Sequence, residues 1–150
     1  MEGSREKLIK EIVALSQSDN WVQAKKEWSL ELVYFSSDEQ HCLCGQLIKE
    51  CCVLTNLKNS TSAIVGNVCV NKFMEIESDK IFKSVKKIQK DLSKSLNKET
   101  INYAHQKNWI NTWERDFYLN ISHRRKLSEK QSSKLNQVNK KIINNIIQKP

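Results

Sequence analysis

The apolar positions near the start of the chain follow a helical period and then change character. Residues 4–16 place five aliphatic side chains among charged residues at helical spacing, which predicts a short amphipathic helix. Asp19 or Asn20 can cap a second helix that begins at Trp21. The segment LELVYF that follows suits either a strand or a continuation of this helix, because its β-branched and aromatic residues favour strands.

The middle of the chain is richest in residues that favour strands. Residues 48–57 and 61–65, with the polar turn LKNS between them, predict a β-hairpin. Gly66 and Asn67 then lead into VCVNKFMEI. If this segment is helical, Cys69 lies in its first turn, where the helix dipole favours a thiolate.

The second half of the chain carries the strongest helical patterns. Residues 81–92 build one apolar face, and lysines form a stripe on another. Further helix starts are marked by a cap or a capping box at Asn97, at Asn111 with Glu114, and at Ser128 with Gln131. The basic loop SHRRK lies between the last two of these helices.

All five cysteines lie within residues 41–73, in an arrangement typical of a small zinc site. Cys42 and Cys44 flank one residue and are followed by Gly45, which allows the tight turn that brings two thiolates together. In a reducing cytosol such a cluster is more typical of metal binding than of disulfides, and five thiols would leave one unpaired. The competing interpretation is buried free cysteines without a metal.

Three neighbouring residues are candidates for the third ligand of the predicted site: Cys51, Cys52 and His41. Cys51 and Cys52 point to opposite faces if they lie on a strand, so only one of them can reach the metal. His41 is an alternative, although its closeness to Cys42 would strain the loop. We predict one structural zinc ion per chain, held by Cys42, Cys44, Cys52 and Cys69.

The sequence predicts a treble-clef-like zinc module from three features together: the cysteine turn at residues 42–45, the hairpin, and a ligand at the start of a helix. With only three glycines, and a single proline at the last position, the fold class is α+β and mainly α. We expect residues 1–76 to form the N-terminal helix and the zinc module. Residues 77–150 form a basic helical region, which we expect to pack on the first part as one compact unit.

Charge is divided unevenly along the 150 residues. Residues 1–74 contain eight Lys or Arg against nine Asp or Glu, whereas residues 75–150 contain seventeen against eight, so the formal net charge of +8 arises downstream of the cysteines. Such a field attracts polyanions, although lysine stripes are also ordinary solvated helix faces. The candidate residues for binding DNA, RNA or a protein partner are Lys83, Lys87, Lys90, Lys94, Arg124, Arg125, Lys126, Lys130 and Lys134. The aromatic residues Trp109, Trp113, Phe117 and Tyr118 could stack on bases, but their helical spacing predicts a place in the core.

Catalytic patterns are missing from the sequence. A four-thiolate zinc site is closed, the deaminase pattern lacks its proline, and no phosphate-cradling glycine loop or nucleophile elbow is present. We therefore predict a protein that is not an enzyme and has no small-molecule substrate. No apolar run is long enough to span a membrane and the N-terminus lacks a signal peptide's apolar block, so we expect a cytoplasmic protein that binds no membrane.

Five segments together resemble a family of small, mostly uncharacterised zinc-binding proteins of bacteria, phages and mobile elements. They are AKKEWSLELVYF, CLCGQLIKECCVLTNLKN, VGNVCVNKF, WERDFY and RKLSEKQ. The resemblance implies a zinc site whose third cysteine falls at Cys52, with a loop after Gly45 that is shorter here than in the family. It implies no settled activity.

The sequence predicts a zinc-stabilised protein that binds nucleic acid through its basic helices, of phage or mobile-element origin. The alternative is an inhibitor or adaptor that docks its basic half on a host or defence enzyme.

Overall fold

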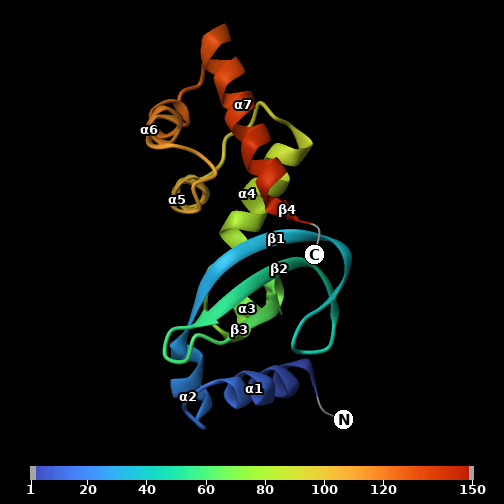
Figure 1. Cartoon of the computed structure of the whole chain (residues 1–150). Helices are drawn as coiled ribbons and strands as arrows, with labels where there is room; N and C mark the ends of the chain where they lie inside the picture. The colour runs from blue at the N-terminus through green and yellow to red at the C-terminus, as the bar shows by residue number, and fades with distance from the viewer. Residues whose placement is uncertain (1–2, 149–150) are drawn as a thin grey trace. The chain divides into compact units, whose positions relative to one another are not determined.

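The computed structural model describes residues 3–148, which divide into two compact units (Figure 1). The first, which we call the sheet unit, runs up to Asp79 and includes the short strand β4. The second, the helical unit, covers residues 80–146. The chain contains both helices and strands, and helices account for more of it, so the predicted α+β, mainly α class is confirmed. The packing of the two halves as one unit stays a prediction.

The sheet unit combines short helices with four strands. Its elements are α1 (Ser4–Leu15), α2 (Trp21–Ala24), the 3₁₀ turn η1 (Lys25–Glu27), β1 (Trp28–His41), β2 (Leu47–Asn56), β3 (Ser62–Gly66), α3 (Asn67–Phe73) and β4 (Ile147–Gln148). The predicted first helix is confirmed, and it buries Leu8 and Ile12 completely. Asn20 caps α2 by accepting a hydrogen bond from the backbone N–H of Gln23.

The strands form a sheet in the order β3-β2-β1-β4. The pairs β1–β2 and β2–β3 are antiparallel, and β4 pairs in parallel with β1. The segment LELVYF, which suited a helix or a strand, lies in β1, where β-branched and aromatic side chains pack well. The predicted hairpin is β2–β3, in which Cys51 lies opposite Gly66.

A buried carboxylate ties the start of the sheet to the segment after α1. The two oxygens of Glu27 accept hydrogen bonds from the backbone N–H groups of Gln17 and Ser18, at 2.8 and 2.9 Å, and from the side-chain amide of Asn56 at 2.9 Å. These bonds favour the ionised form, and the one from Asn56 contributes most, so the pKa of Glu27 lies below its usual value. The side-chain oxygen of Asn56 also accepts a hydrogen bond from the backbone N–H of Lys58 in the hairpin turn.

The helical unit contains four helices, three of which start at the predicted caps. Its elements are α4 (Asp79–Lys90), whose first residue belongs to the sheet unit, α5 (Lys98–Gln106), α6 (Thr112–Ile121) and α7 (Glu129–Ile146). Asn97 accepts the backbone N–H of Thr100, and capping boxes are present at Asn111 with Glu114 and at Ser128 with Gln131.

Two buried polar groups join α6 to α7. The hydroxyl of Tyr118, on α6, accepts the backbone N–H of Leu96 and donates to the side-chain oxygen of Asn139 on α7. Glu114, only 2% exposed, accepts a hydrogen bond from Lys141 at 2.7 Å. Burial opposes ionisation of Glu114, but the lysine and the backbone N–H of Asn111 outweigh it, and its pKa is lowered.

The hydrogen bonds of Glu27 predict a pH-dependent stability. Because the pKa of Glu27 is lower in the folded state than in the unfolded state, its stabilising contribution is present above the unfolded pKa and is lost as pH falls through the folded pKa. We expect Glu27→Gln to lower the urea midpoint at neutral pH, with the gap from the wild type closing as pH falls below about 4. Glu11→Gln, on α1 and outside this network, is the matched control; a gap that is constant with pH would contradict the assignment.

Candidate metal centre

Two of the cysteines lie in a tight turn between strands. β1 ends at His41 and β2 begins at Leu47, so Cys42 and Cys44 lie in the connection. Gly45 has a φ of +95°, a conformation that side chains rarely adopt, and its N–H bonds to the carbonyl of Cys42 at 2.8 Å. This turn directs both sulfurs to one side, as the sequence predicted.

The third cysteine arrives from a distant part of the chain. Cys69 lies in the first turn of α3, directly after the β2–β3 hairpin, and its place there confirms the prediction. The Sγ atoms of Cys42, Cys44 and Cys69 all lie within 4.8 Å of one another. Sulfurs bound to one tetrahedral zinc at about 2.3 Å would be about 3.8 Å apart, so small side-chain adjustments suffice to hold a metal ion.

Hydrogen bonds polarise this group of thiols. The sulfur of Cys42 accepts a hydrogen bond from the thiol of Cys69 and from the backbone N–H groups of Cys44 and Gly66, at 3.4 and 3.2 Å. The bond from Cys69 contributes most to a pKa of about 5 for Cys42, whereas the same bond raises the pKa of Cys69. A cation bound between the sulfurs would take the place of the shared proton.

The other two cysteines do not join the group. Cys52, predicted as the third ligand, is completely buried in the middle of β2 next to the hydroxyl of Ser78, and burial raises its pKa to about 12. Cys51 donates its thiol proton to the carbonyl of Lys49 at 3.6 Å. The structure therefore brings together three of the four predicted ligands and places Cys52 elsewhere, because the sheet fixes the direction of its side chain.

His41, the alternative third ligand, is also outside the group of sulfurs. Its side chain is about half exposed and lies 3.9 Å from the carboxylate of Glu39. The backbone of His41 still pairs with Leu47 at the end of the β1–β2 ladder, so this residue belongs to the strand and not to the turn.

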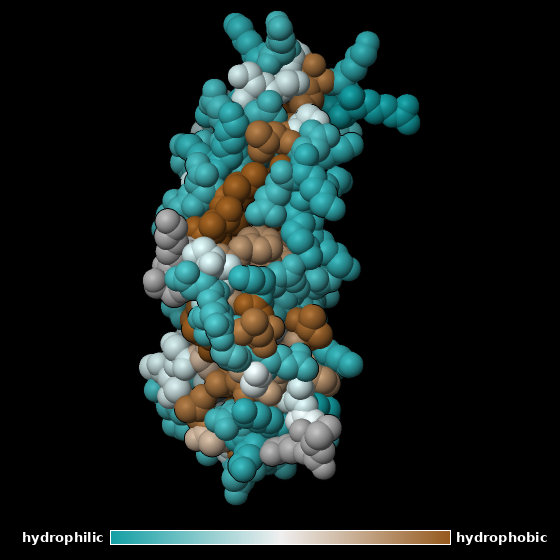
Figure 2. Space-filling view, turned by 90° about the vertical axis from the view of Figure 1, so that its right-hand side faces the viewer, coloured by the Kyte–Doolittle hydropathy of each residue, from teal (hydrophilic) through white to brown (hydrophobic). Residues whose placement is uncertain are grey.

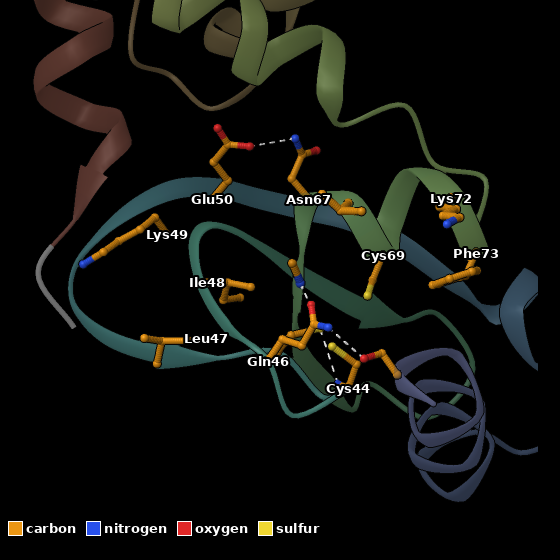
Figure 3. A pocket seen from close by; sticks show the side chains of 14 residues that line it. Cys44, Gln46, Leu47, Ile48, Lys49, Glu50, Asn67, Cys69, Lys72 and Phe73 are labelled. Carbon is orange, nitrogen blue, oxygen red and sulfur yellow. Dashed lines mark hydrogen bonds between the residues drawn. The ribbon is translucent and has the colours of Figure 1, made fainter. Parts of the chain in front are cut away.

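A pocket of about 460 Å³ reaches the three sulfurs (Figure 3). The three cysteines line it and keep between 4% and 7% of their surface exposed. The rest of the lining comes from the start of α1, from the turn before β2 and the first part of β2, from the end of β3 and from α3: Ser4, Gln46, Leu47, Ile48, Lys49, Glu50, Gly66, Asn67, Val68, Lys72 and Phe73. The sulfurs thus form part of a pocket wall, a feature that sequence spacing did not indicate.

The predicted lysine stripe lines two hollows on the helical unit. Lys83, Lys87, Lys90 and Lys94 surround one of about 400 Å³, together with Lys86 and Asp91. Lys83 and Lys87 also line a second hollow of about 490 Å³, to which Lys98 and Ser122 contribute. Sequence reasoning missed Lys86 and Lys98. Lys86 lies three residues after Lys83 and four before Lys90, so helical spacing could have found it. Lys98 belongs to α5, and its proximity to the stripe depends on how α4 and α5 pack.

The remaining basic candidates fall into two groups. Arg124, Arg125, Lys126 and Lys130 are exposed, in the connection between α6 and α7 and in the first turn of α7. Lys134 differs, because its ammonium group lies 3.6 Å from the carboxylate of Glu114 and 5.4 Å from the ring centre of Trp113.

The predicted aromatic core is only partly correct. Tyr118 is completely buried, whereas Trp113 is 61% exposed. Trp113 lies in the first turn of α6 and stacks on Phe117, with ring centres 5.3 Å apart and an interplanar angle of 7°. The stack covers one face of the indole ring, and the cation of Lys134 lies over the ring as well.

No protein-family model matches the chain, and comparisons with curated proteins and with solved structures find no significant match. The resemblance to a family of small zinc-binding proteins therefore stays a prediction. Within the described residues, no helix is both long and apolar enough to span a lipid bilayer.

The grouping of the sulfurs predicts which cysteines a metal needs. We expect Cys44→Ser to abolish stoichiometric binding of added Zn²⁺, because only two of the three grouped sulfurs would remain. Cys52→Ser should retain the metal, since its sulfur lies outside the group. Elemental analysis after gel filtration measures both, with circular dichroism to confirm folding; loss of zinc from the Cys52 variant and not from the Cys44 variant would refute the grouping.

Proposed function

We propose that the protein is a zinc-stabilised nucleic-acid-binding protein without catalytic activity. The observation that carries this proposal is the gathering of six lysines, from α4, the segment after it and the start of α5, around two hollows that share Lys83 and Lys87. The zinc ion is a structural element of the sheet unit, and the helical unit supplies the contacts to the polyanion.

Zinc is the metal that fits the donor set best. Three thiolates are soft ligands, which select Zn²⁺ over the hard cations Mg²⁺ and Ca²⁺. The order of a cysteine knuckle, a hairpin and a helix with a ligand in its first turn supports the description as a treble-clef-like module. In this role the ion joins the turn between β1 and β2 to the start of α3 and adds to the hydrogen bonds that already connect them.

Phosphate binding is supported by the position and the spacing of the lysines. Lys87 and Lys90 follow one another along the exposed side of α4, and Lys94 continues the row beyond the end of the helix. Asp91 is the one acidic group that lines the first hollow among the described residues. Each ammonium group that replaces condensed counterions on a phosphate backbone adds a salt-dependent term to the binding free energy.

The basic surface extends beyond α4. Ser122, the first residue of the SHRRK loop, lines the second hollow with Lys83 and Lys87, so one end of that loop lies beside the stripe. The upper part of Figure 2 shows hydrophilic side chains over much of the helical unit, with an apolar strip between them. The position of Ser122 beside the lysine stripe supports a continuous basic surface that runs from the stripe to the arginines that follow Ser122.

Replacing three lysines tests the proposal. We expect the triple variant Lys87→Gln, Lys90→Gln, Lys94→Gln to weaken binding to DNA and RNA and to lower the slope of log K against log[salt] by about two to three, one unit for each lost phosphate contact. The control is the triple variant Lys10→Gln, Lys26→Gln, Lys58→Gln, which removes the same charge from the sheet unit. Fluorescence anisotropy at several salt concentrations measures both; equal losses in the two variants would indicate a general charge effect and contradict a defined site.

A further inference from the structure

The coordination of the proposed zinc ion is incomplete within the sheet unit. Among residues 3–148, only Cys42, Cys44 and Cys69 form a group with metal-ligand spacing. Tetrahedral zinc takes four ligands, and a site with three protein ligands keeps the fourth position for water or an outside ligand. A structural site closed by Cys52 would need the sulfur of that residue to leave its buried place beside Ser78.

The three sulfurs lie in the wall of a cavity of suitable size. All three cysteines line the pocket of about 460 Å³, which falls within the usual range for small-ligand sites. Leu47 and Val68, which are 60% and 71% exposed, also line this pocket and give it apolar surface. A ligand with a short organic body can therefore reach the ion while it contacts apolar surface.

The charges around the site favour an anionic donor. Zinc with three thiolates carries a formal charge of −1, and a fourth thiolate would make it −2. Lys49 and Lys72 line the same pocket, against one carboxylate from Glu50. The ammonium group of Lys7 lies against Gly45, where an added Cβ would meet it at 3.0 Å. These cations lower the cost of a second negative charge.

We propose that the zinc centre binds a small thiol, as its thiolate, at a fourth coordination position that opens into this pocket. The inference rests on the proposed zinc site and adds a ligand to it. The thiol loses its proton to solvent as its sulfur replaces a water molecule on the metal, and no bond within the protein is made or broken. Binding is reversible and requires no oxidant.

Cobalt substitution provides the test, because the charge-transfer absorption of Co²⁺ reports the thiolates bound to it. The full chain, loaded with one Co²⁺ in a thiol-free reductant, is titrated with 2-mercaptoethanol, and ethanol serves as the oxygen analogue. We expect the charge-transfer band to grow in proportion to one additional sulfur and to saturate, whereas ethanol leaves it unchanged. Cys51→Ser and Cys52→Ser should show the starting band and the titration of the wild type.

A charge variant separates a defined pocket from simple access to the metal. Lys72→Gln should weaken the binding of 2-mercaptoethanol about two- to fivefold without a change in cobalt stoichiometry, because this exposed cation stabilises the added thiolate only through solvent. Lys26→Gln, which lies outside the pocket lining, should bind the thiol as the wild type does.

Three results would overturn the inference. The first is a four-thiolate band before any thiol is added, lost in Cys51→Ser or Cys52→Ser. The second is a band that does not respond to 2-mercaptoethanol, and the third is release of cobalt by the thiol, seen as metal lost on desalting. Failure of the proposed zinc site itself gives a different result, since no charge-transfer band would form at all.

Discussion

Three sulfur atoms within 4.8 Å of one another impose the main physical constraint on the sheet unit. The buried sulfur of Cys42 accepts hydrogen bonds from two backbone N–H groups and from the thiol of Cys69, and these bonds compensate for its burial. The bond from Gly66 connects the end of the hairpin directly to the cysteine turn. The sulfur of Cys42 is therefore a point at which the turn, β3 and α3 meet, and the same point is where we propose that a cation binds.

Buried polar groups position the other elements. Asn67, Asn71 and Ser78 form a closed set of hydrogen bonds that joins α3 to the segment leading into α4. Glu27 with Asn56, and Tyr118 with Asn139, have the same role elsewhere. Within the described part of the chain, no buried side-chain nitrogen or oxygen lacks a partner. In a chain with only 39% apolar residues, such satisfied networks specify which elements meet, because an unpaired buried group would cost about 1–3 kcal/mol.

Local features of the fold could be predicted from the sequence, and long-range ones could not. Caps at Asn20 and Asn97 and the box at Asn111 depend on atoms within three residues, so their sequence patterns were sufficient. To choose Cys52 as a ligand, one must know which face of β2 approaches α3 and at what distance. The spacing of the cysteines along the sequence does not carry this information. The exposure of Trp113 was missed for a similar reason, since helical periodicity identifies an apolar face but not whether another element covers all of it.

Because of the strand β4, the chain contributes to the sheet unit twice, before and after the helical unit. The chain leaves the sheet unit after Asp79 and returns to it at Ile147, where it pairs with Phe35 of β1. In the sequence the helical unit is thus an insertion, and the chain continues from both of its ends into the sheet unit. A cut between the units at residue 80 would also carry β4 away and leave that part of β1 as an unprotected edge, so separate expression of the two halves would expose a surface prone to strand-to-strand aggregation.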